Sequence, residues 1–225
     1  MYPWRKAKIV KTFQVAADMK SIIVVPADMT EEFPPHRAGQ HFELCLPGTN
    51  IIRKYSVVSP IHTKGELEFG VQLIENGELS PKLWALEVGD EIEIRGPIGR
   101  SFVWDEAHTG PLVLIGAGSG ITPILCIYNS FRALYPEGGC VFIMSAKDAS
   151  RIMYYEKLKD ILITRFTKTE GRMDREFLKT HIGTFAENPN TMCYISGPDN
   201  FVDDMVDIVS DLGIHEDNIR SERFI

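Results

Sequence analysis

A glycine-rich segment, GAGSGITP at residues 116–123, follows an apolar run and precedes a stretch with helical periodicity. Glycines at such a strand-to-helix turn let backbone N–H groups approach a pyrophosphate, and the N-terminus of the helix favours negative charge. The spacing is not that of the GxGxxG fingerprint, because the third glycine comes one residue early. The segment therefore indicates a phosphate-binding loop, and a purely structural turn is the alternative.

A second candidate segment lies at the end of the next apolar run, where Ser145 is followed by Lys147, Asp148, Ser150 and Arg151. A site selective for NAD places a carboxylate on the ribose at this point, whereas hydroxyl and basic groups suit the additional 2′-phosphate of NADPH. The composition of this loop favours NADPH, and Asp148 in the same loop leaves NADH open.

In the first half of the chain, Arg53-Lys54-Tyr55-Ser56 occupies a predicted strand. Alternation along a strand places Arg53 and Tyr55 on one face, where the guanidinium can pair with a pyrophosphate and can stack on a ring. An ordinary strand with a polar edge is the alternative interpretation.

Gly77-Glu78-Leu79-Ser80 opens a predicted helix at residues 80–88, with Ser80 as the N-cap and Pro81 in the first turn. The free N–H groups and the hydroxyl at this point would suit a second phosphate pair. A plain N-cap without a ligand is the alternative.

Short β-rich runs separated by Gly, Pro and Asn occupy the first half of the chain. The predicted strands cover residues 7–15, 21–27, 40–47, 53–59, 67–74 and 90–96. Strands of this length and spacing predict a small antiparallel barrel or sandwich.

The second half alternates apolar runs with helical stretches. Predicted strands at 112–118, 140–146, 161–166 and 191–197 alternate with predicted helices at 122–134, 150–160, 174–182 and 200–213. This alternation predicts a parallel sheet covered on both faces. We therefore expect an antiparallel β-barrel domain at residues 1–104 followed by a parallel-sheet α/β domain at residues 105–225, with the hinge between Phe102 and Gly110.

The composition limits the classes of function. The chain has 225 residues and a formal net charge of −7, which argues against binding a nucleic-acid backbone. No stretch reaches the roughly 18 consecutive apolar residues of a membrane-spanning helix, and the N-terminal segment lacks the apolar run of a signal peptide. We expect a cytoplasmic protein. The four cysteines and six histidines show no ligand spacing, so no metal site is expected.

Five of these segments, in chain order, resemble motifs of the ferredoxin-NADP reductase superfamily. They are RKYS at 53–56, the stretch from Gly77 to Phe102, GAGSGITP at 116–123, CYISGPDNFVDDM at 193–205 and IRSERF at 219–224. The resemblance covers nearly the whole chain. It implies an FAD-binding barrel joined to an NAD(P)-binding domain, with hydride passing from nicotinamide C4 to flavin N5.

The resemblance also implies roles for residues of the flavin site. Arg53 would face the FAD pyrophosphate, Tyr55 would pack on the flavin or its ribityl chain, and Ser56 would hydrogen-bond near N5. The pyrophosphate would be held at the helix start by Gly77, Leu79 and Ser80, and the ring would meet backbone groups of Val71 and Gln72. FMN is the alternative flavin, and the Gly77–Ser80 segment favours FAD because it needs a pyrophosphate to hold.

For the pyridine nucleotide, the resemblance implies a site lined by Gly118, Gly120, Thr122, Gly197 and Pro198. The loop composition described above adds Ser145 and Arg151 at the ribose end. Ser196 stands where the family commonly has a cysteine before Gly-Pro, so a thiol beside the nicotinamide is not expected. Glu222 would lie near the flavin and Phe224 would be a neighbour of its ring. Ser56, Ser196 and Glu222 are the candidate catalytic residues.

A reductase of this kind needs an electron acceptor, and the sequence contains no cysteine run that could bind an iron–sulfur cluster. We therefore expect a separate acceptor, such as a ferredoxin, a flavodoxin, an oxygenase component or a small molecule. Two alternatives remain open at this stage. The chain could be a non-catalytic flavin-holding electron-transfer subunit of a larger complex, or a two-domain protein whose glycine-rich turns are only structural.

Overall fold

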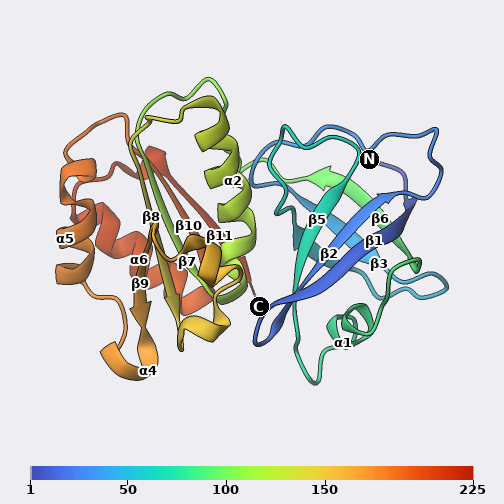
Figure 1. Cartoon of the computed structure of the whole chain (residues 1–225). Helices are drawn as coiled ribbons and strands as arrows, with labels where there is room; N and C mark the ends of the chain where they lie inside the picture. The colour runs from blue at the N-terminus through green and yellow to red at the C-terminus, as the bar shows by residue number, and fades with distance from the viewer. Residues whose placement is uncertain (1, 225) are drawn as a thin grey trace.

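Six antiparallel strands form the first sheet of the computed structural model, which describes residues 2–224 (Figure 1). They are β1 (Arg5–Ala16), β2 (Met19–Pro26), β3 (His41–Cys45), β4 (Arg53–Ser56), β5 (Leu67–Gln72) and β6 (Glu91–Ile98). The strand order is β4-β3-β6-β1-β2-β5, and a bridge between Val57 and Phe69 joins the residue after β4 to β5. The sheet therefore closes on itself as the predicted barrel.

Alternation along the strands fills the interior of this barrel. In β6, Ile92 and Ile94 are fully buried, whereas Glu91 is exposed and Glu93 is half-buried. The inward residues pack with those of the other strands, including Phe69 of β5, into one apolar cluster. Each such side chain stabilises the fold by about 1.5–3 kcal/mol on burial, so the alternation seen in the sequence sets the register of the barrel.

Five parallel strands form the second sheet. They are β7 (Leu112–Ala117), β8 (Cys140–Ala146), β9 (Leu162–Phe166), β10 (Met192–Pro198) and β11 (Ile219–Phe224), in the order β11-β10-β7-β8-β9. The antiparallel barrel followed by a parallel sheet confirms the predicted fold class.

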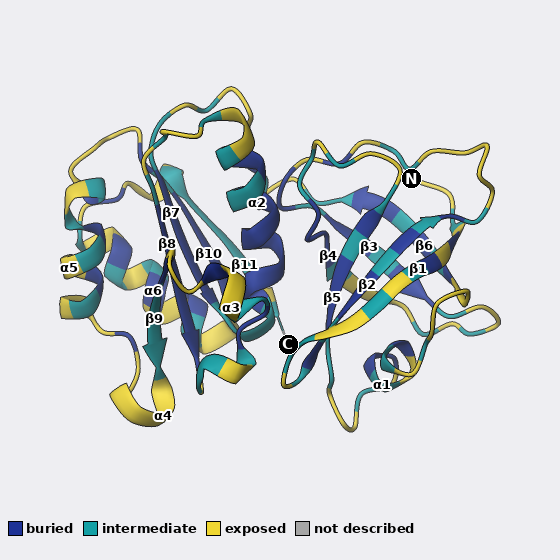
Figure 2. Cartoon of the chain, viewed as in Figure 1, coloured by how far each residue is buried: buried dark blue, intermediate teal, exposed yellow. Residues whose placement is uncertain are grey.

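Helices cover both faces of the parallel sheet. They are α2 (Ile121–Leu134), α3 (Tyr155–Leu158), α4 (Thr167–Glu170), α5 (Arg175–Ala186) and α6 (Asp199–Asp211). In Figure 1, α2 lies on the side toward the barrel and α5 lies on the far side. Figure 2 shows the central strands β7, β8 and β10 as mostly buried, as near-continuous apolar runs require, whereas β9 and β11 at the sheet edges are mostly half-buried. Among the described residues, no helix has the length and apolar character needed to cross a membrane.

The helix predicted at residues 150–160 is interrupted in the structure. A 3₁₀ turn covers Ala149–Arg151, Tyr154 has a left-handed backbone with a φ of 59°, and only the short α3 follows. The Tyr154 N–H donates to the carbonyl of Val15 in the β1–β2 hairpin at 3.1 Å. The expectation of one helix was wrong, because a strand hairpin distant in sequence takes the bond that a continuous helix would have made.

The two halves share an apolar interface. Met19, Ala38 and Val58 of the barrel belong to the same buried cluster as the residues of α2. Trp104, in the connection between β6 and β7, is fully buried and packs edge-on against Phe131 with ring centroids 5.7 Å apart. The predicted domain boundary between residues 104 and 105 falls in this connection and stays a prediction.

Candidate functional site

A cleft of about 340 Å³ lies between the barrel and the parallel sheet. Its lining residues are Arg53, Lys54, Tyr55, Ser56, Gly70, Gln72, Ile74, Gly77, Glu78, Leu79, Ser80, Ser119, Thr122 and Phe224. The barrel contributes one wall, and the turn after β7, the start of α2 and the end of β11 contribute the other. Most residues that the sequence suggested for a flavin site are therefore brought together here.

β4 supplies the aromatic and basic groups of the barrel wall. Burial raises the pKa of Tyr55 to about 12, so its phenol stays protonated at neutral pH. A half-buried neutral ring can pack on a planar ligand and keep its hydroxyl as a donor. Arg53 forms an ion pair with Glu78 at the rim, where both side chains are more than half exposed. An anion that enters the cleft can therefore reach the guanidinium.

The turn before α1 (Ser80–Trp84) differs from the predicted N-cap. The N-cap position is Leu79, and no side chain caps the helix. The Ser80 hydroxyl accepts a hydrogen bond from the Ile74 N–H at 3.1 Å, which folds the turn back on itself. A Cβ at Gly77 would lie 2.9 Å from the Ser80 Oγ and 3.0 Å from the Ile74 carbonyl oxygen, so the turn packs closely around this glycine. Ser80 was wrongly expected as the cap, because its hydroxyl meets a partner outside the helix.

The glycine-rich turn after β7 forms the sheet wall. Gly118 has a φ of +56° and open space around its α-carbon. At Gly120, a Cβ would lie 2.1 Å from the Ser196 carbonyl oxygen, so the turn can pack on β10 only with glycine there. The Thr122 hydroxyl donates to the Ser119 carbonyl at 2.9 Å. The turn is thus fixed against the sheet while its glycine surface faces outward.

Other predicted nucleotide-binding residues lie at one edge of the parallel sheet. Ser145 is at the end of β8, Arg151 lies in the 3₁₀ turn that follows this strand, and Gly197 and Pro198 are at the end of β10. With the turn after β7, they occupy the carboxyl ends of neighbouring strands, which is where open parallel sheets bind ligands. The side chain of Val71 lies in the barrel core, so only its backbone, between Gly70 and Gln72 of the cleft lining, is near the site.

Four buried polar groups gather where β3 and β4 meet the end of β11. His41 pairs with Ser56 in the register of β3 and β4, and Ser196 pairs with Glu222 in the register of β10 and β11. The His41 Nδ1 lies 3.9 Å from the Glu222 Oε1, too far for a hydrogen bond. The Ser56 Oγ, Ser196 Oγ, His41 Nε2 and Glu222 Oε2 have no hydrogen-bond partner within residues 2–224. Such groups cost stability unless a ligand or water meets them.

Glu222 supplies the carboxyl group of this cluster, and the pKa of this group is shifted. Burial raises its pKa to about 7, although the charge of Lys54 and the nearby Ser56 hydroxyl lower it. Burial and the charge of Lys54 also lower the pKa of His41, so His41 is neutral at pH 7 and offers Glu222 no counter-charge. A carboxyl with a pKa near the working pH can hold or release a proton.

Sequence reasoning missed several residues of the site. His41 joins the polar cluster only because β3 and β4 pair in this register. Gly70 lines the cleft opposite the start of α2, so close to it that a Cβ at this position would lie 2.6 Å from the Thr122 methyl group. Ile74 and Ser119 also line the cleft and were missed, although Ser119 lies inside the GAGSGITP segment and Ile74 lies three residues before Gly77. The RKYS strand could have drawn attention to its pairing partner, but the sequence does not show which strand that is.

Comparisons of sequence agree with this arrangement. Residues 6–103 match the model of the oxidoreductase FAD-binding domain family. The flavohemoprotein of Bacillus subtilis is 28% identical over 98% of this chain and 60% of its own length. The reductase component of propane 2-monooxygenase from Rhodococcus jostii is 27% identical over 69% of this chain and 42% of its own length. This chain therefore spans at most about 60% of the length of these relatives.

Solved structures share the whole fold. The cytochrome P450 reductase GcoB of Amycolatopsis has a TM-score of 0.83 at 20% identity, covering 100% of this chain and 71% of that one. Phthalate dioxygenase reductase has a TM-score of 0.81 at 18% identity, covering 98% of this chain and 68% of that one. These likenesses show that the chain shares the two-sheet fold of these reductases, and residues 6–103 match the oxidoreductase FAD-binding domain family.

Proposed function

We propose that this chain is an NAD(P)H-dependent flavoprotein reductase, which moves hydride from a reduced nicotinamide to N5 of FAD and then single electrons to a separate acceptor. The observation that carries the proposal is the cleft, in which the RKYS strand of the barrel faces the glycine-rich turn of the parallel sheet. Bound FAD would supply a ring that takes up two electrons as hydride and gives them up singly.

The residues of the cleft fit such a cofactor. The orphaned hydroxyl of Ser56 and the orphaned carboxylate oxygen of Glu222 are buried polar atoms that a flavin and its bound water can satisfy. Gly118 leaves open space at the end of β7, where a nicotinamide ring needs close approach to the backbone. Both halves therefore offer what a stacked pair of rings requires, which is flat contact surface and a few polar groups at its edge.

Each wall of the cleft has a distinct task in this proposal. Arg53 and the turn ending at Ser80 bind the FAD diphosphate, and Tyr55 packs on the flavin. Backbone groups of Val71 and Gln72 and the ring of Phe224 border the isoalloxazine. The nucleotide is held by Gly118, Gly120, Thr122, Gly197 and Pro198, with Ser145 and Arg151 beyond its ribose. These residues bind, orient and exclude water, which are the main protein contributions to hydride transfer.

Ser56, Glu222 and Ser196 are the proposed catalytic residues. A Glu222 carboxyl with a pKa of about 7 is half protonated at neutral pH, so it can hold or release a proton beside the cleft. Ser196 offers a hydroxyl at the end of β10, next to the glycine-rich turn. The role of Ser196 is polar contact with the nicotinamide.

The acceptor in this proposal is an oxygenase component or a one-electron carrier protein. Sequence relatives include the reductase component of phenol 2-monooxygenase from Pseudomonas, which is 38% identical over 39% of this chain and 25% of its own length. A non-catalytic flavin subunit is the second candidate. This candidate is less favoured, because a subunit that receives electrons from another redox centre does not need a nucleotide-binding turn. The close packing of Gly120 on β10 gives the turn after β7 the shape that suits a nucleotide. The cytoplasmic location stays a prediction.

A pair of neighbouring variants tests these roles. We expect Tyr55→Ala to weaken FAD binding, because the packed ring is lost, and Ser56→Ala to keep FAD but slow its reduction by NADH or NADPH. Flavin content is read from absorbance, and the reduction rate from stopped-flow bleaching under anaerobic conditions. Tyr2→Ala, at an exposed aromatic residue of the barrel, is the matched control. Wild-type flavin content and reduction rate in both cleft variants would refute the assignment.

A further inference from the structure

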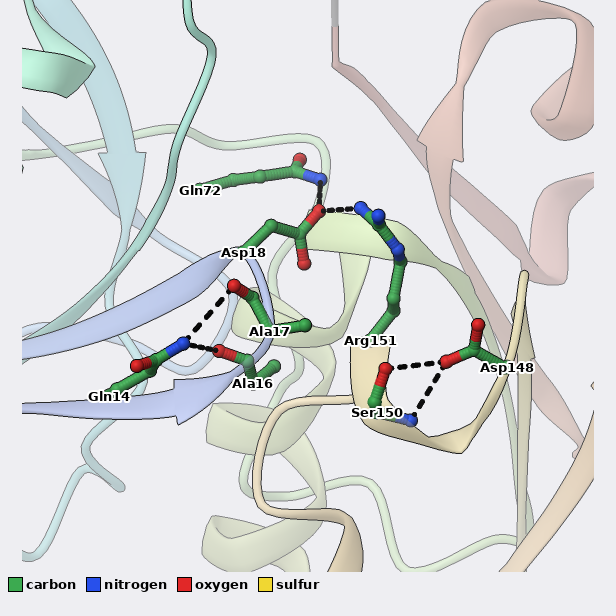
Figure 3. A network of polar contacts seen from close by, with 8 residues as sticks. All are labelled: Gln14, Ala16, Ala17, Asp18, Gln72, Asp148, Ser150 and Arg151. Atoms are coloured by element: carbon green, nitrogen blue, oxygen red, sulfur yellow. Dashed lines mark hydrogen bonds and ion pairs between the residues drawn. The ribbon is translucent and has the colours of Figure 1, made fainter.

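The tip of the β1–β2 hairpin reaches from the barrel to the loop after β8 and holds it (Figure 3). The Arg151 Nη1 lies 2.8 Å from the Asp18 Oδ2, and the Gln72 Nε2 donates to the same oxygen at 3.0 Å. The Ala17 N–H donates to the Ser150 carbonyl at 2.7 Å. Asp18 therefore connects Gln72 of the flavin cleft with the basic residue at the ribose end of the nucleotide site.

The other polar groups of this loop are also engaged. The Asp148 carboxylate accepts hydrogen bonds from the Ser150 N–H at 3.1 Å and from its hydroxyl at 2.6 Å. The hydroxyl bond with Ser150, and to a lesser degree the charges of Lys168 and Arg151, lower the pKa of Asp148, so this carboxylate is ionised. Lys147 is the other basic residue of the loop and is exposed. The loop thus presents the Asp148 carboxylate, and Arg151 is already paired with the carboxylate of Asp18.

Release of Arg151 would leave Asp18 in an unfavourable position. The Asp18 side chain is only 18% exposed, and its Oδ1 is buried without a hydrogen-bond partner. Removing the one guanidinium paired with it leaves a largely buried charge with a single amide donor, which is strongly destabilising. A ligand phosphate that recruits Arg151 must overcome this cost.

We propose that Asp18 sets the nucleotide preference of the site, by holding Arg151 away from a 2′-phosphate and so favouring NADH over NADPH. This reverses the preference for NADPH expected from the loop composition, in which the partner of Arg151 could not be seen. The inference rests on the proposed function, since it assumes that the ribose lies at the end of β8.

Two probes that differ only in the 2′-phosphate test the proposal. Adenosine 5′-monophosphate and adenosine 2′,5′-bisphosphate are titrated calorimetrically into the FAD-loaded protein at low salt. Wild type should bind the bisphosphate no more tightly than the monophosphate. Asp18→Asn keeps an oxygen for Gln72 but removes the charge, so it should tighten bisphosphate binding about tenfold and leave monophosphate binding unchanged, as expected for one gained guanidinium–phosphate contact.

Two further variants make the test specific. Glu156→Gln removes one negative charge from α3, where Glu156 pairs with Lys159, and should change neither affinity. Adding Arg151→Met to Asp18→Asn should abolish the gain, because the freed guanidinium is gone. A wild type that prefers the bisphosphate, an Asp18→Asn variant with an unchanged ratio, or no binding of either probe would overturn the proposal.

A second experiment distinguishes failure of the proposed function from failure of this inference. The rate at which NADH and NADPH reduce the bound FAD is measured anaerobically in the same preparations. Reduction by both nucleotides with no change of their ratio in Asp18→Asn would refute the role of Asp18 alone. A flavin that neither nucleotide reduces would refute the reductase proposal itself.

Discussion

Glu222 gives a prediction about stability that follows from its burial. Its pKa is raised from 4.5 to about 7, so the folded state favours the neutral carboxyl more than the unfolded state does. Below pH 4.5 the carboxyl is neutral in both states and the effect is absent. As pH rises toward 7, the carboxyl ionises first in the unfolded chain, which lowers the free energy of the unfolded state relative to the folded protein. The folded state therefore loses stability between pH 4.5 and 7 and stays penalised above that range.

The size of the effect follows from the shift. A shift of about 2.5 units at about 1.4 kcal/mol per unit corresponds to a penalty of about 3 kcal/mol above pH 7. The side chain is only 21% exposed, so solvent screens little of this penalty. Glu222→Gln is neutral at every pH and should be more stable than wild type by about 3 kcal/mol at pH 8.5, but by less than about 1 kcal/mol at pH 5.

Urea unfolding at the two pH values, with and without added FAD, measures the difference. Glu216→Gln, at an exposed glutamate in the turn before β11, is the matched control and should leave the pH dependence of wild type unchanged. A Glu222→Gln variant that is less stable than wild type at pH 8.5, or whose advantage is the same at both pH values, would refute the reasoning. The same variant should reduce its flavin more slowly, since it can no longer hold or release a proton at this position.

The remaining predictions concern glycine and the rim of the cleft. Gly120→Ala should destabilise the protein by about 1–3 kcal/mol and weaken adenosine 5′-monophosphate binding, because its Cβ would lie 2.1 Å from the Ser196 carbonyl oxygen. Gly183→Ala, inside α5 with open space around it, should stabilise the protein by about 0.5–1 kcal/mol, and thermal unfolding of both glycine variants measures these changes. Glu78→Gln removes the partner of Arg53 and should lower the dissociation constant of FAD severalfold, measured by fluorescence titration; an unchanged constant would count against Arg53 as a diphosphate ligand.

Local pattern was sufficient for the elements of the fold. The near-continuous apolar runs that became β7, β8 and β10 predicted strands buried on both faces, and the alternation in β6 predicted a strand with one face in the core of a barrel or sandwich. The segments around Ser56 and Gly120 were recognisable because their chemistry is local, with a glycine, a hydroxyl and an arginine inside short stretches.

The parts of the site that escaped prediction depend on contacts between residues far apart in sequence. Asp18 and Arg151 are 133 positions apart in the sequence. The loop is basic by composition, but this ion pair already engages its arginine. His41 faces Glu222 only after two strands of different sheets have been placed side by side. Helical periodicity at 150–160 is real, but Val15 competes for the backbone there. No window of sequence contains both members of these pairs.

The most direct test of the central claim is the absorbance spectrum of the purified protein with FAD, recorded anaerobically before and after NADH and then NADPH. We predict flavin bands that bleach, faster with NADH, because the RKYS strand of the barrel faces the glycine-rich turn of the parallel sheet across the cleft. A protein that binds no FAD, or whose bound flavin keeps its bands with both nucleotides, would contradict it.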